Sequence, residues 1–353
     1  MAKSIIYLTP PLLQDCHIKE KIVCIRAHRE RLFNVSAQKI NEKLIFHNYG
    51  HGGAGWTFLF GSVHESLRQF EQQLLCNDRL KKKPIAIIGA GCYGLLTALF
   101  LARKGNSVRI IAKDIDDIPS YKAAGFFFPR PRKCSTPQET TVFHSLGMES
   151  YATYHAIATG RHPFIGAGAQ LLPAYFGTDI DPGFGPYITH KLLKAPKQVR
   201  IDFNTGKIYD TMAYTTVFIN AAALMQELWR IVKELEIPVI RTEIATFDDV
   251  EESIIFNCAG LGAKKLTADP RIVPVQGHLI TLKNQPDISA LNYMINVKVI
   301  QKGPKGMRDE LIYFAPKDEG ILGITFIRGQ DSLTANQQEF DRLLERCRDF
   351  FGT

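Results

Sequence analysis

The sequence lacks the features of a protein stabilised by disulfides or structural zinc. Its 7 cysteines are odd in number and scattered, and no two of them stand in the C-x-x-C spacing of zinc sites and redox pairs. Such a set predicts free thiols in a reducing compartment. Hydrophobic residues make up 45% and charged residues 22% of the chain. These values are ordinary for globular proteins and exclude disordered, collagen-like and coiled-coil classes.

Targeting and membrane signals are also missing. The N-terminal residues show no basic region followed by an apolar stretch, and the closing Phe-Gly-Thr is not the peroxisomal tripeptide. We therefore expect a cytoplasmic protein. Residues 85–102 are uncharged and reach the lower limit of length for a membrane helix. Their three glycines are explained by a soluble turn and not by a lipid-exposed helix, so we expect no membrane span.

The charge balance is modestly basic. Lys and Arg number 43 against 35 Asp and Glu, giving a net charge of +8. A nucleotide cofactor or an acidic metabolite would satisfy this excess as well as nucleic acid would. Only the net charge and residues 81–83 (KKK) would support nucleic-acid binding, and no aromatic residues are interleaved with these lysines. We therefore expect no nucleic-acid binding. The length of 353 residues suits one large or two modest domains.

Residues 85–112 have the pattern of a βαβ unit that binds a dinucleotide. A short apolar strand leads into Gly89-x-Gly91-x-x-Gly94, which opens a helix, and a second strand follows. Gly89 permits the tight turn, Gly91 lets the backbone approach a pyrophosphate, and Gly94 lets helix and strand pack closely. The charge of the pyrophosphate then lies at the helix N-terminus.

The unit departs from the pattern where its second strand ends. An acidic residue there would accept hydrogen bonds from the ribose hydroxyls, but the position holds Lys113, followed by Asp114. A lysine only donates. Either a one-residue shift lets Asp114 take the role, or Lys113 meets the 2′-phosphate of NADP. This unit alone does not separate FAD from NAD(P).

A second glycine-rich turn, residues 52–55 (GGAG), also follows a predicted strand and opens a predicted helix. In a flavin site, a helix N-terminus beside the ring would stabilise the negative charge of its reduced form. The alternative is a turn that only lets the backbone pack. Residues 77–84 (NDRLKKKP) are polar and basic and form the clearest linker.

Three further segments give secondary-structure signals of different strength. A helix is predicted from Asn220 as its N-cap, ended by Pro238. Two apolar runs flank residues 316–320 and predict a hairpin. Residues 126–215 are rich in Pro, Gly and aromatics and give only weak periodic signals.

At this point the motifs carry a family resemblance. Residues 47–57 (HNYGHGGAGWT) closely resemble the flavin-binding signature of the D-amino-acid oxidase and D-aspartate oxidase family. Further matching segments are AAG at 123–125 with Pro129 following, FNCAGLGAKKL at 256–266, PVQGH at 274–278 and YFAP at 313–316. The resemblance implies an α/β fold with a Rossmann-type FAD-binding domain, residues 32–134 and 217–268. It also implies a mixed β-sheet α+β substrate domain, residues 1–31, 135–216 and 269–353.

The order of these segments is not the family's. There the Gly-x-Gly-x-x-Gly strand starts the protein and the HNYGHGG segment lies near the C-terminus. Here residues 47–57 precede Gly89, and a segment resembling the family's late KIVCIRAHRERLFN stands at 21–34. We expect a circular permutation, with the family's ends joined through residues 77–84. The alternative is a composite of gene fragments.

The resemblance implies FAD as cofactor and assigns residues to it. The ADP half would contact Gly89, Ala90, Gly91, Cys92, Tyr93, Gly94, Lys113 and Asp114, with Ile244 at the adenine and Ala259 and Gly260 beside them. Ser120, Ala124, Gly125 and Phe126 would lie along the phosphates and the ring. The flavin itself would be held by Gly52, Gly53, Ala54, Gly55, Trp56 and Thr57.

The substrate side is implied in the same way. Arg26 matches an arginine that binds the substrate carboxylate with two parallel donors, although the proline that usually follows it is Ala27 here. Tyr313 matches a tyrosine that also contacts the carboxylate, and the Gly53 carbonyl would orient the amine. Another active-site tyrosine of the family falls at about Asp309 and is absent. Phe128 and Arg130 lie in the stretch that shapes the side-chain pocket. If Arg130 points inward, it would favour substrates with an acidic side chain. If it points outward, which is the orientation we expect, it would be solvated.

The implied reaction oxidises the C–N bond of a small, carboxylate-bearing amino acid or amine. Hydride passes from Cα to flavin N5, the imine hydrolyses, and O2 reoxidises the flavin to give H2O2, so catalysis is mostly positioning. No metal is expected, because His28, His47, His51 and His278 lack ligand spacing. A homodimer is left open. An NADP-dependent dehydrogenase and a non-catalytic flavin-binding homologue are the alternatives.

Overall fold

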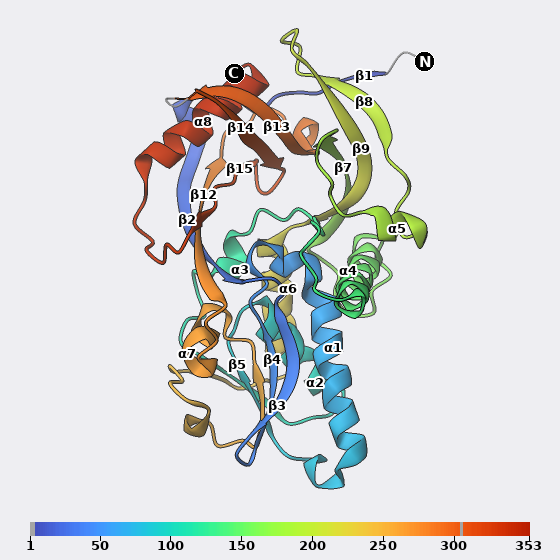
Figure 1. Cartoon of the computed structure of the whole chain (residues 1–353), viewed down its shortest axis with the longest axis vertical. Coiled ribbons are helices and arrows are strands. Elements are labelled where there is room, and N and C mark those ends of the chain that lie inside the picture. Colours follow the sequence, from blue (N-terminus) through green and yellow to red (C-terminus); the bar gives the residue numbers. More distant parts are fainter. Residues whose placement is uncertain (1–3, 304–305) are drawn as a thin grey trace.

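Two β-sheets organise the chain (Figure 1). The computed structural model describes residues 4–303 and 306–353. The smaller sheet lies in the lower half of Figure 1 with α1 and α2, and the larger sheet lies in the upper half with α8. This two-sheet α/β architecture confirms the predicted fold class.

The smaller sheet has the order β10-β6-β5-β11-β4-β3 and is parallel except for β3. Its strands are β3 (Asn34–Ile40), β4 (Lys43–Tyr49), β5 (Ile85–Ile88), β6 (Val108–Ala112), β10 (Val239–Arg241) and β11 (Ile254–Asn257). Central strands β5 and β11 are buried at every position, as expected where both faces of a parallel sheet are covered. All these strands lie within the predicted ranges 32–134 and 217–268. The domain boundaries themselves stay predictions.

Three helices cover one face of this sheet: α1 (Gly55–Cys76), α2 (Cys92–Arg103) and α6 (Ala221–Glu234). The predicted βαβ unit is present, since β5 and β6 are parallel neighbours joined by α2. The predicted start of α6 is also confirmed, because the Asn220 side chain accepts a hydrogen bond from the Ala223 N–H at 3.1 Å. Within the described residues, no helix combines the length and apolar character needed to cross a bilayer.

The larger sheet is mixed, with the order β1-β8-β9-β7-β13-β14-β15-β12-β16 and β2 paired to β12. Its strands are β1 (Ile5–Tyr7), β2 (Ile18–Arg29), β7 (Ala169–Gly177), β8 (Lys197–Asp202), β9 (Ile208–Ile219), β12 (Ile272–Leu282), β13 (Met294–Gly303), β14 (Gly306–Ala315), β15 (Ile321–Gly323) and β16 (Ile327–Arg328). The antiparallel pairing of β14 with β15 confirms the predicted hairpin around residues 316–320. Helix α8 (Gln337–Phe351) packs its apolar side against this sheet.

The remaining helices are α3 (Pro119–Lys122), α4 (Pro137–Ala158), α5 (Gly185–Thr189) and α7 (Ala263–Thr267). Helix α4 was not predicted, because residues 126–215 gave only weak periodic signals. It packs against α1.

Both glycine turns lie at one edge of the smaller sheet. Residues 89–94 follow the carboxyl end of β5, and residues 50–55 follow the carboxyl end of β4, with β11 between the two strands. Neighbouring strands are about 4.8 Å apart, so the two turns emerge on the order of 10 Å from each other. Ligands of open α/β sheets bind outside the carboxyl ends of the strands, and the candidate site lies there.

Candidate flavin and substrate site

The first glycine turn fits the roles predicted for its three glycines. Gly89 has φ +108°, and a Cβ atom there would lie 2.5 Å from the carbonyl oxygen of Cys258. A Cβ at Gly94 would overlap the carbonyl oxygen of Gly89, whereas one at Gly91 would meet only the Ser120 hydroxyl, at 3.1 Å. Backbone oxygens can make room only if the strand or helix shifts, so a side chain at Gly89 or Gly94 would distort the turn. Gly91 faces the space in front of the turn.

The N-terminus of α2 opens toward the same space. Its N-cap is Gly91, which has no side chain to cap the helix, and the Cys92 N–H donates to the Ser120 hydroxyl at 3.2 Å. Backbone N–H groups at the start of a helix, together with the helix dipole, suit a phosphate. The predicted cofactor residues Gly91, Cys92 and Ser120 are therefore close together in space.

The second glycine turn is in direct contact with the first. A 3-10 turn, Gly52–Ala54, leads into α1. The Tyr93 hydroxyl donates to the Gly55 carbonyl at 2.7 Å, and the Trp56 indole N–H donates to the Ser120 carbonyl at 3.2 Å. Two turns far apart in the sequence thus meet through hydrogen bonds, which the sequence order alone did not show.

The stretch 124–128 is held beside α1 and the larger sheet. Gly125 has φ +93°, and a Cβ there would overlap the Ile219 carbonyl. The Thr57 hydroxyl accepts a hydrogen bond from the Phe128 N–H at 3.2 Å. These contacts leave the Phe126 ring 5.3 Å from the ring of Tyr313, and so bring a predicted cofactor residue next to a predicted substrate residue.

Arg26, on β2, is buried and points toward the second glycine turn. It is 8% exposed, and its Cδ lies 3.6 Å from the position of a Cβ on Gly53. Its Nη1 donates to the Thr325 carbonyl at 3.0 Å. Its Nη2 is buried and has no partner among the described residues. Burial lowers the pKa of Arg26, and an arginine remains charged even so. A buried cation with an unused donor requires an anion.

Gly277 makes room for this guanidinium. A Cβ at that position would overlap its nitrogens. The neighbouring His278 N–H donates to the Thr325 hydroxyl at 2.9 Å, and Thr325 is the residue whose carbonyl receives Arg26. From the sequence alone, the motif at 274–278 carried only the family resemblance. The structure shows that it shapes the surroundings of Arg26.

Tyr313, on β14, is buried and faces the same region. Burial raises the pKa of its hydroxyl, while Arg26 and a backbone hydrogen bond from Phe126 act in the opposite direction. The hydroxyl therefore stays protonated and can donate. Arg26, Tyr313, Gly53 and Phe126 are thus brought together, as the resemblance implied.

The adenine end is more exposed. Lys113 Nζ lies 3.1 Å from the Glu243 carboxylate, and both side chains are more than half exposed. Asp114 is exposed as well. Ile244 and Ala259 pack on one apolar cluster under the sheet, and Gly260 has φ +56°. Glu243 was not among the predicted site residues. It lies here because β10 ends beside β6, which places residues 113 and 243 at adjacent strand ends.

Two positions in the substrate region lie away from the cluster. Arg130 is exposed, as expected for the outward orientation. The basic stretch 129–133 is not solvated throughout, because Arg132 Nη2 donates to the His51 carbonyl at 3.0 Å. Asp309 is exposed in the hairpin of β13 and β14, opposite Ile300. Nothing aromatic replaces the family's tyrosine at that position.

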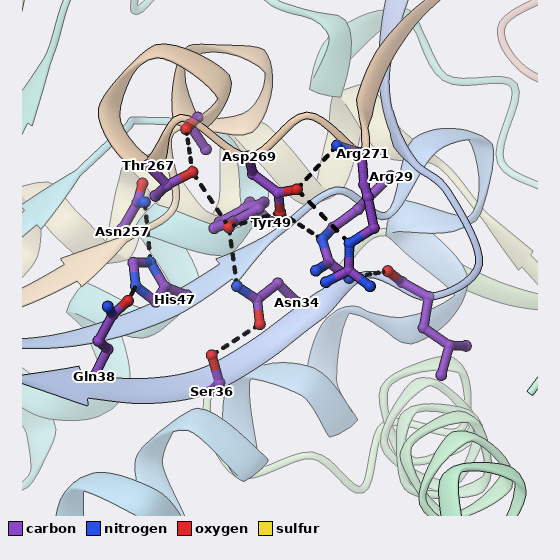
Figure 2. Close-up of polar contacts among 12 residues, drawn as sticks. Arg29, Asn34, Ser36, Gln38, His47, Tyr49, Asn257, Thr267, Asp269 and Arg271 are labelled. Atoms are coloured by element: carbon purple, nitrogen blue, oxygen red, sulfur yellow. Dashed lines mark hydrogen bonds and ion pairs between the residues drawn. The ribbon is translucent and has the colours of Figure 1, made fainter. Parts of the chain in front are cut away.

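A polar network ties β2 and the carboxyl end of β4 together (Figure 2). Arg29 Nε lies 2.6 Å from the Asp269 carboxylate, which also accepts from the Tyr49 hydroxyl at 3.1 Å. Asn34 donates to that hydroxyl at 2.9 Å. Arg29 is three residues after Arg26, and Tyr49 ends the strand before the second glycine turn. The network therefore holds the strand that carries Arg26 in place beside the second glycine turn.

His47 belongs to the same region and holds a neutral ring. The Asn257 amide donates to its Nδ1 at 3.2 Å, so its Nε2–H donates to the Gln38 side-chain oxygen at 3.2 Å (Figure 2). His51 is stacked between Phe33 and Tyr93, with ring centroids 4.2 and 4.1 Å away. Both histidines therefore support the backbone of the turn. No group of three or more metal-ligating side chains is found in the described part of the chain.

The neutral His47 ring makes stability depend on pH. Burial lowers its pKa from 6.5 to about 4 in the folded protein. Between these values the unfolded state binds the proton and the folded state does not, so the free energy of unfolding falls as the pH falls. We expect His47 to lower the free energy of unfolding by up to about 3 kcal/mol as the pH falls through this range. Denaturant unfolding of wild type and His47→Gln at about pH 7 and about pH 4.5 measures it. An equal loss in both proteins would contradict the prediction.

Comparisons with known proteins agree with this geometry. Residues 84–353 match the DAO family of FAD dependent oxidoreductases. A D-amino-acid oxidase of Dictyostelium discoideum is 28% identical over 220 residues, which cover 59% of each protein. The human D-aspartate oxidase is 26% identical over 217 residues, which cover 56% of this chain and 59% of the relative. The matched part of this chain thus covers about 59% of the length of each of these two relatives.

A solved structure shows the same fold. The iminodiacetate oxidase of Chelativorans sp. BNC1 superposes with a TM-score of 0.53 at 14% identity, covering 75% of this chain and 78% of that one. The family match covers well over half of the chain and selects FAD over NAD(P). This chain belongs to the DAO family of FAD-dependent oxidoreductases and is a D-amino-acid-oxidase-like flavoprotein.

Proposed function

We propose that the protein oxidises the C–N bond of a small amino acid or amine that carries a carboxylate. The observation that carries the proposal is the buried Nη2 of Arg26, which has no partner among the described residues, on a side chain whose Cδ lies 3.6 Å from the position of a Cβ on Gly53. A substrate carboxylate supplies the missing acceptor, and a guanidinium binds a carboxylate through two parallel hydrogen bonds. The matching D-amino-acid oxidases are consistent with such a substrate.

The residues around Arg26 position the substrate. The Tyr313 hydroxyl, kept protonated by burial, donates a second type of hydrogen bond to the carboxylate. The Gly53 carbonyl accepts from the amine and so fixes the orientation of Cα. Phe126 is buried beside Tyr313, and the ring of Phe326, itself exposed, lies 4.8 Å from the Arg26 guanidinium. No acid or base side chain is assigned, so the contribution of the chain is mostly orientation.

The two glycine turns fit one FAD. The space before Gly91 and the start of α2 suit its pyrophosphate, and residues 52–57 with 124–126 suit its ring. Ala90, Tyr93, Lys113, Asp114, Ile244, Ala259 and Gly260 are assigned to the remaining contacts of the ADP half. When bound, FAD supplies the hydride acceptor. Reoxidation by O2 with release of H2O2 is part of the proposal.

We also propose that the segment order is a circular permutation. The family match begins at residue 84, yet β2 and β4, which precede it, are integral strands of the two sheets. Arg348, in the last helix, donates to the Leu13 carbonyl at 2.8 Å, so this helix lies beside the segment leading into β2. A short connection there would restore the family's order without moving a strand.

A non-catalytic flavin-binding homologue is the second candidate. It is favoured by the exposed Asp309, which stands where the family has a tyrosine. The two candidates share the cofactor and differ in whether a substrate reduces it.

Anaerobic titration of the purified protein decides between them. We expect a yellow protein whose visible flavin band is bleached by at least one α-amino acid among both enantiomers of the common series, glycine and N-methyl amines. Chemical reduction by dithionite is the control for a competent flavin. A band that dithionite bleaches and no amino acid affects would support the non-catalytic homologue. A colourless protein that does not take up FAD would contradict the proposal.

A further inference from the structure

A buried asparagine lies next to the proposed carboxylate site. Asn296, on β13, is directly opposite Tyr313 in the ladder of β13 and β14. Side chains that face each other across an antiparallel pair project to the same side of the sheet. Asn296 therefore projects to the side of Tyr313, Phe126 and the second glycine turn. Its neighbours Ile295 and Val297 project to the other side and pack in the cluster of α8.

The surroundings of Asn296 are aromatic. On its other flank it is in register with Phe176 of β7. The Phe126 ring lies 5.3 Å from the rings of both Phe176 and Tyr313. Because β13 runs between the strands of those two residues, Phe126 lies over the strand that carries Asn296. The rings of Phe126, Phe176 and Tyr313 thus lie on the side of the sheet to which Asn296 projects.

This amide has no hydrogen-bond partner in the described part of the chain. Asn296 is 1% exposed, and both Oδ1 and Nδ2 are buried and unpartnered. Buried polar groups are nearly always hydrogen-bonded, and an apolar residue of similar size would fill this place without loss. The Asn296 amide therefore has a donor and an acceptor free for a ligand, and the unpartnered Nη2 of Arg26 has a free donor. Such groups are typical of a site that binds a polar ligand.

We propose that Asn296 binds the side chain of the substrate and selects an uncharged group that can hydrogen-bond, a carboxamide or a hydroxyl. The inference rests on the proposed function, since the substrate is held by Arg26 through its carboxylate. An amide offers two donors and one acceptor, which a carboxamide or hydroxyl complements. An acidic side chain is disfavoured, because Arg130, the cation expected to bind it, is exposed.

The test is the rate constant of anaerobic flavin reduction with matched pairs of substrates. Threonine and valine are nearly isosteric, as are asparagine and leucine, and each pair is used in the enantiomer that bleaches the flavin. We expect the wild type to prefer threonine over valine and asparagine over leucine at least tenfold in kcat/KM. A site built to hydrogen-bond a substrate rejects the analogue that lacks the group.

Asn296→Leu should lower kcat/KM for the polar member of each pair by about 10- to 100-fold. Alanine, which has no side chain to hydrogen-bond, should be oxidised within about threefold of the wild-type rate. Met294→Leu is the matched control: Met294 is buried on the same side of β13 two residues earlier and should leave the ratios unchanged.

These measurements distinguish a wrong role for Asn296 from a wrong proposed function. A wild type that oxidises amino acids but prefers valine and leucine, or treats both members alike, overturns the role of Asn296 even if no variant folds. Equal ratios in wild type and Asn296→Leu overturn it as well. Failure of every amino acid to bleach a dithionite-reducible flavin contradicts the proposed function itself, and the role of Asn296 with it.

Discussion

Replacing Arg26 with alanine should abolish reduction of the flavin by carboxylate-bearing substrates. The variant removes a buried cation that lies beside Gly53 and leaves the substrate carboxylate without its charged partner. Truncating one partner of a buried, hydrogen-bonded charge pair costs about 4 kcal/mol, which corresponds to a fall in kcat/KM of about a thousandfold. Anaerobic stopped-flow measurement of flavin bleaching gives this value directly.

Arg26→Lys is the matched control. It keeps the charge but loses the planar pair of donors, so it should recover only part of the activity. Both variants should retain FAD, since Arg26 is assigned to the substrate and not to the cofactor. Bleaching of Arg26→Ala at the wild-type rate would show that the carboxylate is bound elsewhere.

Replacing Gly94 with alanine should remove FAD binding and weaken the fold. A Cβ at this position would overlap the carbonyl oxygen of Gly89, within the turn that faces the pyrophosphate. The backbone of β5 or α2 must therefore shift, and overpacking of this kind costs about 3 kcal/mol. We expect loss of the visible flavin band after purification, together with a lower midpoint of denaturation.

Gly185→Ala serves as the control for the Gly94 variant. Gly185 begins α5, and nothing lies within 4 Å of the position of its Cβ. This variant should keep both the flavin and the stability of the wild type. Full flavin content in Gly94→Ala would mean that residues 89–94 do not hold the pyrophosphate.

The parts of the fold that the sequence predicted are those that depend on local backbone geometry. Gly89 and Gly94 are required by contacts within a single βαβ unit, so their spacing alone indicates the turn. Asn220 caps α6 through a residue three positions away, and such a signal is readable along the chain. The hairpin of β14 and β15 is equally local.

Helix α4 was missed because its buried side is not strongly apolar. It includes Gly147, Ser150 and the hydroxyl-bearing Tyr151 and Tyr154, so the apolar periodicity is diluted. Its start did carry a signal. Thr136 accepts from the Glu139 N–H at 3.1 Å, and Pro137 stands at the first helical position.

The features that the sequence could not give depend on partners distant along the chain. Glu243 meets Lys113 only because β10 and β6 are neighbours. Asp269 meets Arg29 across 240 residues, and the isolation of the Asn296 amide is visible only once the aromatic rings around it are placed. Arg26 has no local signal at all. The family resemblance pointed to it, and the structure gives the reason in its burial and its unused nitrogen.

We propose that one FAD spans two glycine turns whose order along the chain is reversed relative to the family. A crystal structure of the FAD-loaded protein is the decisive experiment. We expect a single FAD with its pyrophosphate at Gly91 and the first N–H groups of α2, and its ring against residues 52–55. A FAD that contacts only one of the two turns, or a ring bound away from Gly53 and Arg26, would contradict it.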